Sequence, residues 1–279
     1  MSYYKRDSIN KYQEILNNTP NIDKVHKVVI SLSGGLDSTT LLYLMVKKLG
    51  AENVFALSFS YQQRHLVELK QASKTCEILK VQHKIIDISF LGDLVSSVSA
   101  MVRGNIATPT MGDLSAERQV PTYVPFRNMI LSSMTLAYAE VINANGIALG
   151  VQYGDYENAE AYSYWDTSAD FHEAIQRVAD LNDKHHITFI APFVKLKKAD
   201  EIQLGMELDI PFENSWTCYN PIIQPNGVTY ITEPAGGVNV KRLNKYIPCG
   251  VCPSCAGRAE AFKNLGLEDP LIRQNGVIY

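Results

Sequence analysis

Short runs of β-branched and apolar residues alternate along the chain with longer segments in which apolar residues recur at helical spacing. Residues 27–32 are mostly apolar, and in the next segment Leu42, Met45 and Leu49 fall on one helical face. The pattern predicts strands at 27–32, 54–59, 84–88, 147–151 and 187–190, and helices at 38–49, 65–80, 126–143, 169–181 and 198–208. Such alternation predicts an α/β fold: a doubly wound, Rossmann-type parallel sheet covered by helices on both faces.

The two ends of the chain depart from this alternation. Residues 1–25 contain one short amphipathic segment before an Asn- and Pro-containing stop, which predicts an N-terminal helical extension. Residues 91–122 have weak periodicity and predict a long, partly irregular connection. After Trp216 the chain turns rich in glycine and proline, and a last helix is predicted at 256–265. We therefore expect an α/β domain at 26–212 and a C-terminal, metal-binding helical subdomain at 213–279.

Composition and charge favour a small-molecule substrate. The chain has 279 residues, 46% of them hydrophobic, with a formal net charge of -3 and a pI of about 6.1. Proteins whose main task is to grip nucleic acid usually carry a basic excess, which this chain lacks. No run reaches the roughly 18–20 apolar residues needed to span a bilayer, and the N-terminus lacks the pattern of a signal peptide. We expect a cytoplasmic protein without a membrane partner.

A glycine-containing loop joins the first predicted strand to the first helix. Its residues are Ser33, Gly34, Gly35, Leu36, Asp37 and Ser38. The glycines allow a tight turn and a close ligand approach, and the N–H groups that open the helix suit an anion. Asp37 would repel phosphate, so it is better suited to Mg²⁺ or to an adjacent hydrogen bond. An ordinary capped turn is the simpler interpretation, but the complete string resembles the signature of the PP-loop ATP pyrophosphatases, which cleave ATP between the α and β phosphates.

Four of the five cysteines lie in the C-terminal part of the chain. Cys249, Cys252 and Cys255 form two overlapping C-x-x-C steps, and Cys218 lies upstream. Four thiolates suit a closed, tetrahedral Zn²⁺ site, and a reducing compartment disfavours disulfides. A redox pair and an iron–sulfur cluster are the alternatives. Cys76 falls at an apolar helical position, where we expect an ordinary core residue.

Several further motifs occur in the order typical of one family. Tyr61-Gln62-Gln63-Arg64-His65 resembles Tyr-Gly-Gln-Arg-His, Val124-Pro125-Phe126-Arg127-Asn128 resembles Val-Pro-Gly-Arg-Asn, and Leu196-Lys197-Lys198-Ala199-Asp200 resembles Leu-x-Lys-Ala-Glu. With the glycine loop and the cysteine motif, the chain resembles the QueC family of 7-cyano-7-deazaguanine synthases from about Lys27 to Leu265.

The resemblance implies an activity and a set of site residues. It implies that ATP adenylates 7-carboxy-7-deazaguanine, that ammonia displaces AMP to give the amide, and that a second ATP drives dehydration to the nitrile. ATP, Mg²⁺ and Zn²⁺ are the implied cofactors, and homodimers are common in the family. Asp37, Arg127 and Lys198 are the candidate catalytic residues. Candidate ATP contacts are Ser33, Gly34, Gly35, Leu36, Asp37, Ser38, Thr39, Ser58 and Arg64. Candidate substrate contacts are Tyr61, Arg127, Asn128, Tyr164, Trp165 and Asp166. The implied zinc ligands are Cys218, Cys249, Cys252 and Cys255.

The chain departs from the family pattern beside the expected substrate site. The run that follows the fourth strand is longer than usual and has Trp165-Asp166-Thr167 where the family has Pro-Asp-Cys. Phe126 stands where the family has glycine, and the segment 221–248 widens the gap between Cys218 and Cys249. Asp166 keeps a carboxylate for a guanine-like N–H edge, and Tyr164 and Trp165 suit stacking or wall packing.

Three other functions remain open at this stage. A QueC-like enzyme of an antiviral system would stop at the amide, or pass the activated substrate to another amine such as a protein terminus. A tRNA-modifying PP-loop enzyme would need a basic groove and often a catalytic cysteine outside the metal site. A nucleotide-sensing module would bind ATP without turnover, a hypothesis that the retained Asp37, Arg127 and Lys198 disfavour.

Overall fold

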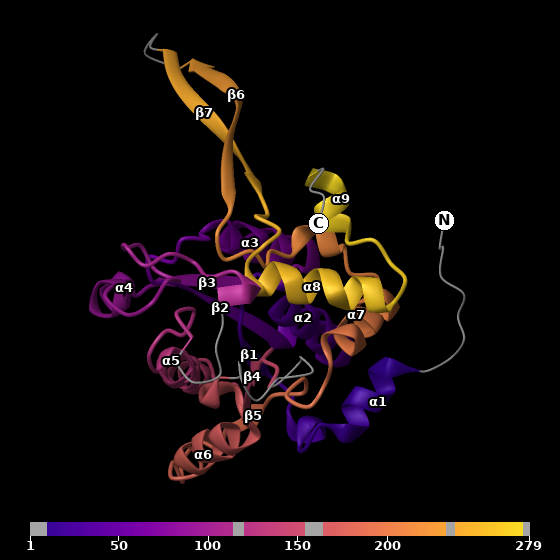
Figure 1. Cartoon of the computed structure of the whole chain (residues 1–279). Coiled ribbons are helices and arrows are strands. Elements are labelled where there is room, and N and C mark those ends of the chain that lie inside the picture. The colour runs from indigo at the N-terminus through magenta and orange to yellow at the C-terminus, as the bar shows by residue number, and fades with distance from the viewer. Residues whose placement is uncertain (1–9, 114–119, 154–163, 233–237, 276–279) are drawn as a thin grey trace.

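The central element of the computed structural model is a five-stranded parallel sheet (Figure 1). The structure describes residues 10–113, 120–153, 164–232 and 238–275. The strands are β1 (Val28–Ser31), β2 (Val54–Ser60), β3 (Gln82–Asp87), β4 (Gly146–Leu149) and β5 (Thr188–Ile190). Their order is β3-β2-β1-β4-β5, so the sheet is wound in both directions from β1. The predicted doubly wound α/β fold is confirmed.

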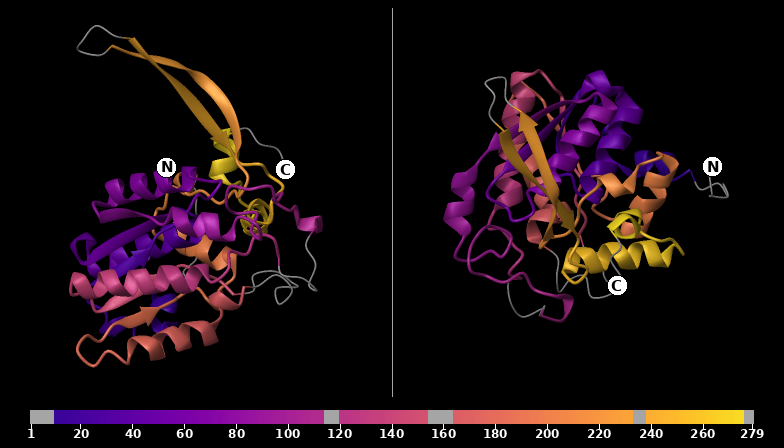
Figure 2. Two further views of the ribbon diagram at one scale, coloured as in Figure 1. Left: turned by 90° about the vertical axis from the view of Figure 1, so that its left-hand side faces the viewer. Right: turned by 90° about the horizontal axis from the view of Figure 1, so that it is seen from above.

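Helices cover both faces of this sheet (Figures 1 and 2). One face packs against α1 (Lys11–Asn18), α2 (Leu36–Leu49), α3 (Val67–Leu79) and α7 (Lys198–Glu207). The other face packs against α4 (Ser89–Val95), α5 (Arg127–Val141) and α6 (Ala169–Ala179). Strand β1 explains this arrangement, because Val28 and Ile30 enter the first core while Val29 enters the second.

The strand order places the switch point of the sheet, where a ligand site is expected, at the carboxyl ends of β1 and β4. These two strands pair in parallel, with Ser31 opposite Leu149 at the end of the ladder. The chain leaves β1 toward β2 on one side and reaches β4 only after crossing the sheet. Ligands of open α/β sheets bind outside such a switch point.

Helix α1 contributes directly to the main core. Ile15 and Leu16 are buried with residues of α2. The backbone N–H groups of Lys11 and Tyr12 donate to the two carboxylate oxygens of Glu207 at 2.8 and 2.9 Å. The division of the chain into an N-terminal extension, an α/β domain and a C-terminal region, with boundaries at residues 26 and 213, stays a prediction.

The C-terminal part contains a hairpin in addition to the predicted helical subdomain. It contains α8 (Pro253–Asn264), α9 (Pro270–Asn275) and an antiparallel hairpin, β6 (Ile222–Thr232) and β7 (Val238–Ile247), which projects from the body (Figures 1 and 2). The hairpin was missed because proline and the Asn–Gly pair indicate a loop by composition. A register shift between Pro225 and Val228 accommodates them within the ladder.

Several predicted boundaries shift for local reasons. The helix predicted at 38–49 begins at Leu36, because the extended Gly35 is already its N-cap. The last long helix begins at Pro253, a residue favoured in the first turn of a helix. Part of the connection predicted at 91–122 belongs to α4. Within the described ranges, we find no helix with the length and apolar character that a membrane crossing requires.

Candidate active site and four-cysteine cluster

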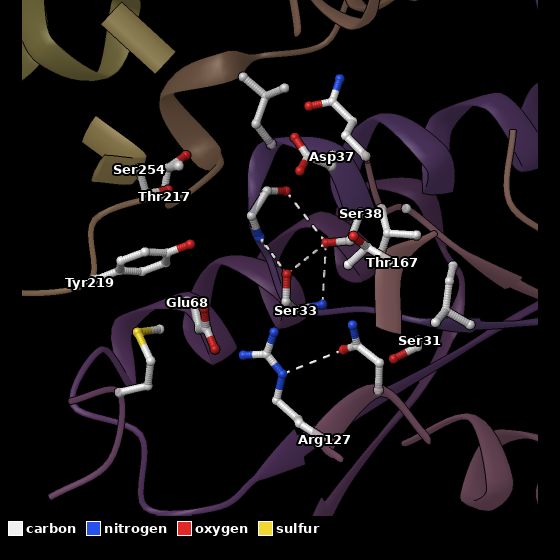
Figure 3. A pocket seen from close by; sticks show the side chains of 18 of the residues that line it. Ser31, Ser33, Asp37, Ser38, Glu68, Arg127, Thr167, Thr217, Tyr219 and Ser254 are labelled. Atoms are coloured by element: carbon white, nitrogen blue, oxygen red, sulfur yellow. Dashed lines mark hydrogen bonds between the residues drawn. The ribbon is translucent and has the colours of Figure 1, made fainter. Parts of the chain in front are cut away.

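Hydroxyl groups organise the glycine loop between β1 and α2. The Ser38 Oγ accepts the N–H groups of Ser33 and Gly34, both at 3.2 Å, and lies 3.0 Å from the Ser33 Oγ (Figure 3). Ser33 Oγ in turn accepts the Gly35 N–H at 3.1 Å. The first N–H groups of α2 have no carbonyl partner one turn earlier in the helix. The loop therefore presents N–H and hydroxyl donors at a helix N-terminus, which is an anion-binding arrangement.

Gly34 has to be glycine for two reasons. Its φ is +87°, in the left-handed region. A Cβ added there would lie 2.1 Å from the carbonyl oxygen of Glu68 in α3. Its own carbonyl accepts the N–H of Trp216 at 2.8 Å. The loop is thus held between α3 and the segment that precedes Cys218.

A pocket of about 320 Å³ opens beside this loop at the switch point of the sheet. Its wall brings together ten of the residues expected from the sequence: Ser33, Gly35, Leu36, Asp37, Ser38, Tyr61, Arg127, Asn128, Tyr164 and Lys198. They come from the loop, from the end of β2, and from α5, α7 and the segment before α6. The candidate phosphate contacts and candidate substrate contacts therefore share one cavity.

Asp37 and Lys198 form an ion pair in this pocket. The Lys198 Nζ donates to the Asp37 Oδ1 at 2.5 Å. Asp37 lies in the first turn of α2, and Lys198 opens α7. The start of α7 is fixed because Asp200 accepts the N–H of Lys197 at 3.1 Å. The pair holds the Lys198 ammonium group beside the anion-binding loop.

A second group of candidate residues surrounds Arg127 at the start of α5. Its Nη1 donates to the Tyr61 hydroxyl at 3.3 Å. Burial lowers the pKa of Arg127, but the neighbouring Tyr61 and Asp166 outweigh it, so the net pKa is raised. Burial raises the pKa of the Asp166 carboxyl, which the charge of Arg127 opposes. Arg127 therefore remains a cation at the pocket wall.

Asp166 and Trp165 do not line the pocket. Asp166 is buried behind Asn128, whose backbone N–H it accepts at 3.3 Å, while the Asn128 side chain donates to the Asp166 carbonyl at 3.1 Å. Trp165 is 44% exposed and donates its Nε1–H to the Tyr123 hydroxyl. In this structure Asp166 orients Asn128 rather than facing the cavity.

Four of the candidate ATP contacts also lie outside the pocket wall: Gly34, Thr39, Ser58 and Arg64. Thr39 is buried within α2. Ser58 is buried and donates to the Leu32 carbonyl at 2.6 Å. Arg64 donates to the backbone carbonyls of residues 102, 104 and 106, at 2.7 to 2.9 Å, and so holds that loop. Ser58 and Arg64 therefore have structural partners, whereas the buried Thr39 hydroxyl has no hydrogen-bond partner among the described residues.

Sequence reasoning gave no role to two acid–base side chains that line the pocket. Glu68 is 7% exposed and His65 is 4% exposed. The His65 Nε2 lies 3.2 Å from the Glu68 Oε2, and the Gln63 Nε2 donates to the Oε1 at 3.3 Å. The only sequence signal for this pair was the presence of Gln63 and His65 in a family motif. Glu68 follows His65 by three residues, a spacing that is common on the surface of ordinary helices.

A buried arginine holds the part of the pocket wall that Trp216 and Thr217 form. Arg258 in α8 makes a bidentate ion pair with Asp269 at 2.7 and 2.9 Å. It also donates to the Ser215 Oγ at 2.8 Å and the Thr217 Oγ1 at 3.1 Å. Thr217 and the adjacent Trp216 line the pocket. Arg258 thus fixes residues 215–217, which contact the glycine loop through Trp216 and lead into Cys218.

The four C-terminal cysteines converge as their spacing predicted. The sulfurs of Cys218, Cys249, Cys252 and Cys255 all lie within 4.8 Å of one another. The Cys249 N–H donates to the Cys218 sulfur at 3.2 Å, and the Cys252 N–H to the Cys249 sulfur at 3.4 Å. Four close thiolate donors with N–H groups directed at sulfur fit a tetrahedral metal site. The cluster can therefore bind a metal ion.

Comparison with known proteins agrees with the motifs. The family model described as queuosine biosynthesis protein QueC matches residues 27–266. A 7-cyano-7-deazaguanine synthase from Caldicellulosiruptor saccharolyticus is 37% identical over 245 residues, covering 88% of this chain and 94% of that protein. The 7-cyano-7-deazaguanine synthase from Trichodesmium erythraeum is 41% identical over 255 residues, covering 88% of this chain and 100% of that protein. An NH3-dependent NAD synthetase from Campylobacter jejuni overlaps 72% of this chain and 69% of its own at 21% identity, with a TM-score of 0.42.

Proposed function

Because this chain belongs to the QueC family of queuosine biosynthesis proteins, we propose that it converts 7-carboxy-7-deazaguanine to 7-cyano-7-deazaguanine with ATP and ammonia. The observation that carries this proposal is the single pocket in which the phosphate loop and Arg127 face one cavity. A carboxylate resists substitution because oxide is a poor leaving group. Adenylation removes that obstacle, and it requires ATP and the carboxylate to meet in one site.

In the first step, the loop and Lys198 would hold the phosphates of ATP. The carboxylate oxygen attacks the α-phosphorus, the bond to the β-phosphate oxygen breaks, and pyrophosphate leaves. Loop N–H groups and the Lys198 ammonium stabilise the charge that develops on the leaving group. Mg²⁺ would supply further charge neutralisation when bound, and Asp37 is the carboxylate placed to hold it. Arg127 would orient the substrate carboxylate from the other wall.

In the second step, ammonia replaces AMP at the acyl carbon and gives the amide. A second ATP would then activate the amide oxygen, and loss of that oxygen as AMP leaves the nitrile. Asn128 and Tyr164 would bind the deazaguanine ring, with Asp166 orienting Asn128 from behind. A cytoplasmic location and a homodimer stay predictions.

The four cysteines would hold Zn²⁺, for which four thiolates are a closed structural donor set. The ion would fix the segment around Cys218. Trp216, two residues earlier, donates its N–H to the phosphate-loop carbonyl of Gly34. This contact supports a structural role in which the metal site helps to shape the pocket.

A second candidate function shares the adenylation step and differs in the acceptor. In it, the activated substrate is passed to another amine, such as a protein terminus, or the reaction ends at the amide. The observation that favours it is Phe126, an exposed aromatic residue held at a φ of +53° beside Arg127. Non-glycine residues in this region store backbone strain, which clusters at functional sites. The ring of Phe126 also contacts that of Trp165 edge to face, so two of the departures from the family pattern meet.

Mass spectrometry of products separates these proposals. The pure protein is incubated with 7-carboxy-7-deazaguanine, ATP, Mg²⁺ and ammonium. The nitrile together with AMP and pyrophosphate supports the synthase. AMP release with only an amide or a protein-bound adduct favours the second candidate. Absence of AMP contradicts both and leaves a nucleotide-sensing module. A tRNA-modifying activity is disfavoured by Cys76, because burial raises the pKa of this thiol to about 12.

A further inference from the structure

We propose that Glu68 is the residue that receives the nitrogen nucleophile. It binds ammonium in the pocket and accepts the proton that is released when the C–N bond forms. This inference rests on the proposed function and assigns a residue to its second step.

The first support is the position of Glu68. It lies in the first turn of α3, and its backbone is pressed against the phosphate loop so closely that Gly34 has no room for a Cβ. Its side chain is 10% exposed and lies among the pocket-lining side chains, with Ser33, Arg127 and Tyr219 (Figure 3). A carboxylate here stands beside the site at which the acyl adenylate would form.

The second support is the charge that the pocket presents at this point. A carboxylate repels the phosphates of ATP, so its natural ligand is a cation. Among the residues that the structure describes, the basic side chain within 4.0 Å of the Glu68 carboxylate is His65, which is charged only when it is protonated. Gln63, the other hydrogen-bond partner, is uncharged. The Glu68 carboxyl group therefore has hydrogen-bonding capacity left for a small cation.

The third support concerns which cation fits. A divalent metal requires several oxygen or sulfur ligands. Within the described ranges, the four cysteines are the group of three or more His, Cys, Asp or Glu side chains that is close enough to hold a metal ion, and Glu68 is not part of it. Asp37, the other acidic residue on the pocket wall, accepts Lys198 through Oδ1 and is the carboxylate already assigned to Mg²⁺. Ammonium needs only hydrogen bonds and one charge, and the nearby rings of Tyr61 and Tyr219 suit a monovalent cation.

The chemistry then balances. Ammonium held at Glu68 first gives one proton to solvent water. The lone pair of the resulting ammonia then forms a bond to the acyl carbon of the adenylate and gives a tetrahedral adduct with a positive nitrogen. This adduct returns to ammonia unless the nitrogen loses a proton, which goes to the Glu68 carboxylate. The carbonyl then reforms, the bond from carbon to the AMP oxygen breaks, and AMP leaves with the electron pair. Gln63 and His65 act as positioning residues that hold the carboxyl group.

The test separates adenylation from amide formation in the full-length protein. Pyrophosphate exchange into ATP, dependent on 7-carboxy-7-deazaguanine, reports the first step. Turnover against ammonium concentration reports the second. For Glu68→Gln we expect exchange within about threefold of the wild type and kcat/KM for ammonium reduced by about 100-fold. Hydroxylamine is largely unprotonated at neutral pH and should restore turnover to within about threefold, read as hydroxamate. Glu77→Gln makes the same change at an exposed position of α3 and should behave as the wild type.

Two further variants keep the proposal falsifiable if Glu68→Gln does not fold. Glu68→Asp retains the charge and should keep more of the ammonium reaction than Glu68→Gln. His65→Asn removes the positioning partner and should lower kcat/KM for ammonium by about 10-fold, with exchange preserved. Loss of exchange in parallel with ammonium turnover overturns the assignment, because Glu68 would then serve ATP. An unchanged dependence on ammonium overturns it as well. A wild-type protein without exchange overturns the proposed function itself, and this assignment with it.

Discussion

The ammonium group of Lys198 donates to the carboxylate of Asp37 at 2.5 Å, although 161 positions of sequence separate the two residues. One belongs to the first helix after the phosphate loop and the other to the helix after the last strand of the sheet. Their side chains are only 29% and 14% exposed, respectively, so solvent screens the pair weakly. The ion pair orients Lys198 toward the loop before any nucleotide arrives.

We predict that Lys198→Ala lowers kcat/KM for ATP by about 100- to 1,000-fold, because the leaving pyrophosphate loses a fixed positive charge. Lys198→Arg should recover part of this loss. The measurement is the rate of AMP formation against ATP concentration. Lys195→Ala, an exposed change in the segment that leads into the same helix, is the matched control and should leave the rate within about twofold. Equal behaviour of the two alanine variants would contradict a role for Lys198 in the transition state.

A glycine substitution tests the packing of the phosphate loop. Gly34→Ala should lower the free energy of unfolding by more than about 2 kcal/mol and abolish ADP binding, because backbone strain adds to a clash with the Glu68 carbonyl. Gly266→Ala is the control, since Gly266 also has a positive φ, +67°, but has open space around its Cβ position. It should cost only about 1 kcal/mol. Urea unfolding and calorimetric ADP titration give the two quantities.

The metal proposal predicts one bound zinc ion per chain. Cys252→Ser should lose the ion and lower the melting temperature, because the fourth thiolate of the cluster is missing. Cys76→Ala should keep the ion, since Cys76 lies in the main hydrophobic core, away from the four clustered sulfurs. Metal analysis by mass spectrometry and thermal unfolding with and without a chelator check this. Iron in place of zinc would overturn the choice of ion.

Local signals accounted for most of the fold and for part of the site. The glycine loop and the three cysteines 249, 252 and 255 are signals that lie within a few residues, and both features formed where the sequence predicted. The contact of Asp37 with Lys198 was not foreseen, since it depends on the strand order that brings two helix N-termini together. Asp166 shows the opposite case: its residue type fits substrate recognition, but the fold buries it behind Asn128. Residue type predicts chemistry, whereas packing decides which side chains reach the cavity.

Glu68 was missed for a related reason. An acidic residue in the first turn of a helix ordinarily complements the helix dipole at the surface. Here α3 packs its first turn against the phosphate loop, so the same residue is buried at the pocket. Only the tertiary arrangement distinguishes the two situations.

The buried His172 predicts a pH dependence of stability. It stacks on Phe189 at 5.0 Å, and neither ring nitrogen has a hydrogen-bond partner among the described residues. Burial lowers the pKa of His172 from 6.5 to about 4. Between these values the unfolded chain binds a proton that the folded chain excludes, so stability is complete above pH 6.5 and falls as the pH drops toward 4. We expect this residue to account for about 1–3 kcal/mol over that window.

His172→Gln should remove this contribution, because glutamine does not titrate. Urea unfolding between pH 4 and pH 7 should then give a shallower slope of unfolding free energy against pH than the wild type, whatever the absolute stability of the variant. His26→Gln makes the same change at an exposed histidine and should leave the slope as it is. A slope unchanged by His172→Gln would place the acid sensitivity in other groups, and would mean that the folded protein can protonate this imidazole without opening the α6–β5 interface.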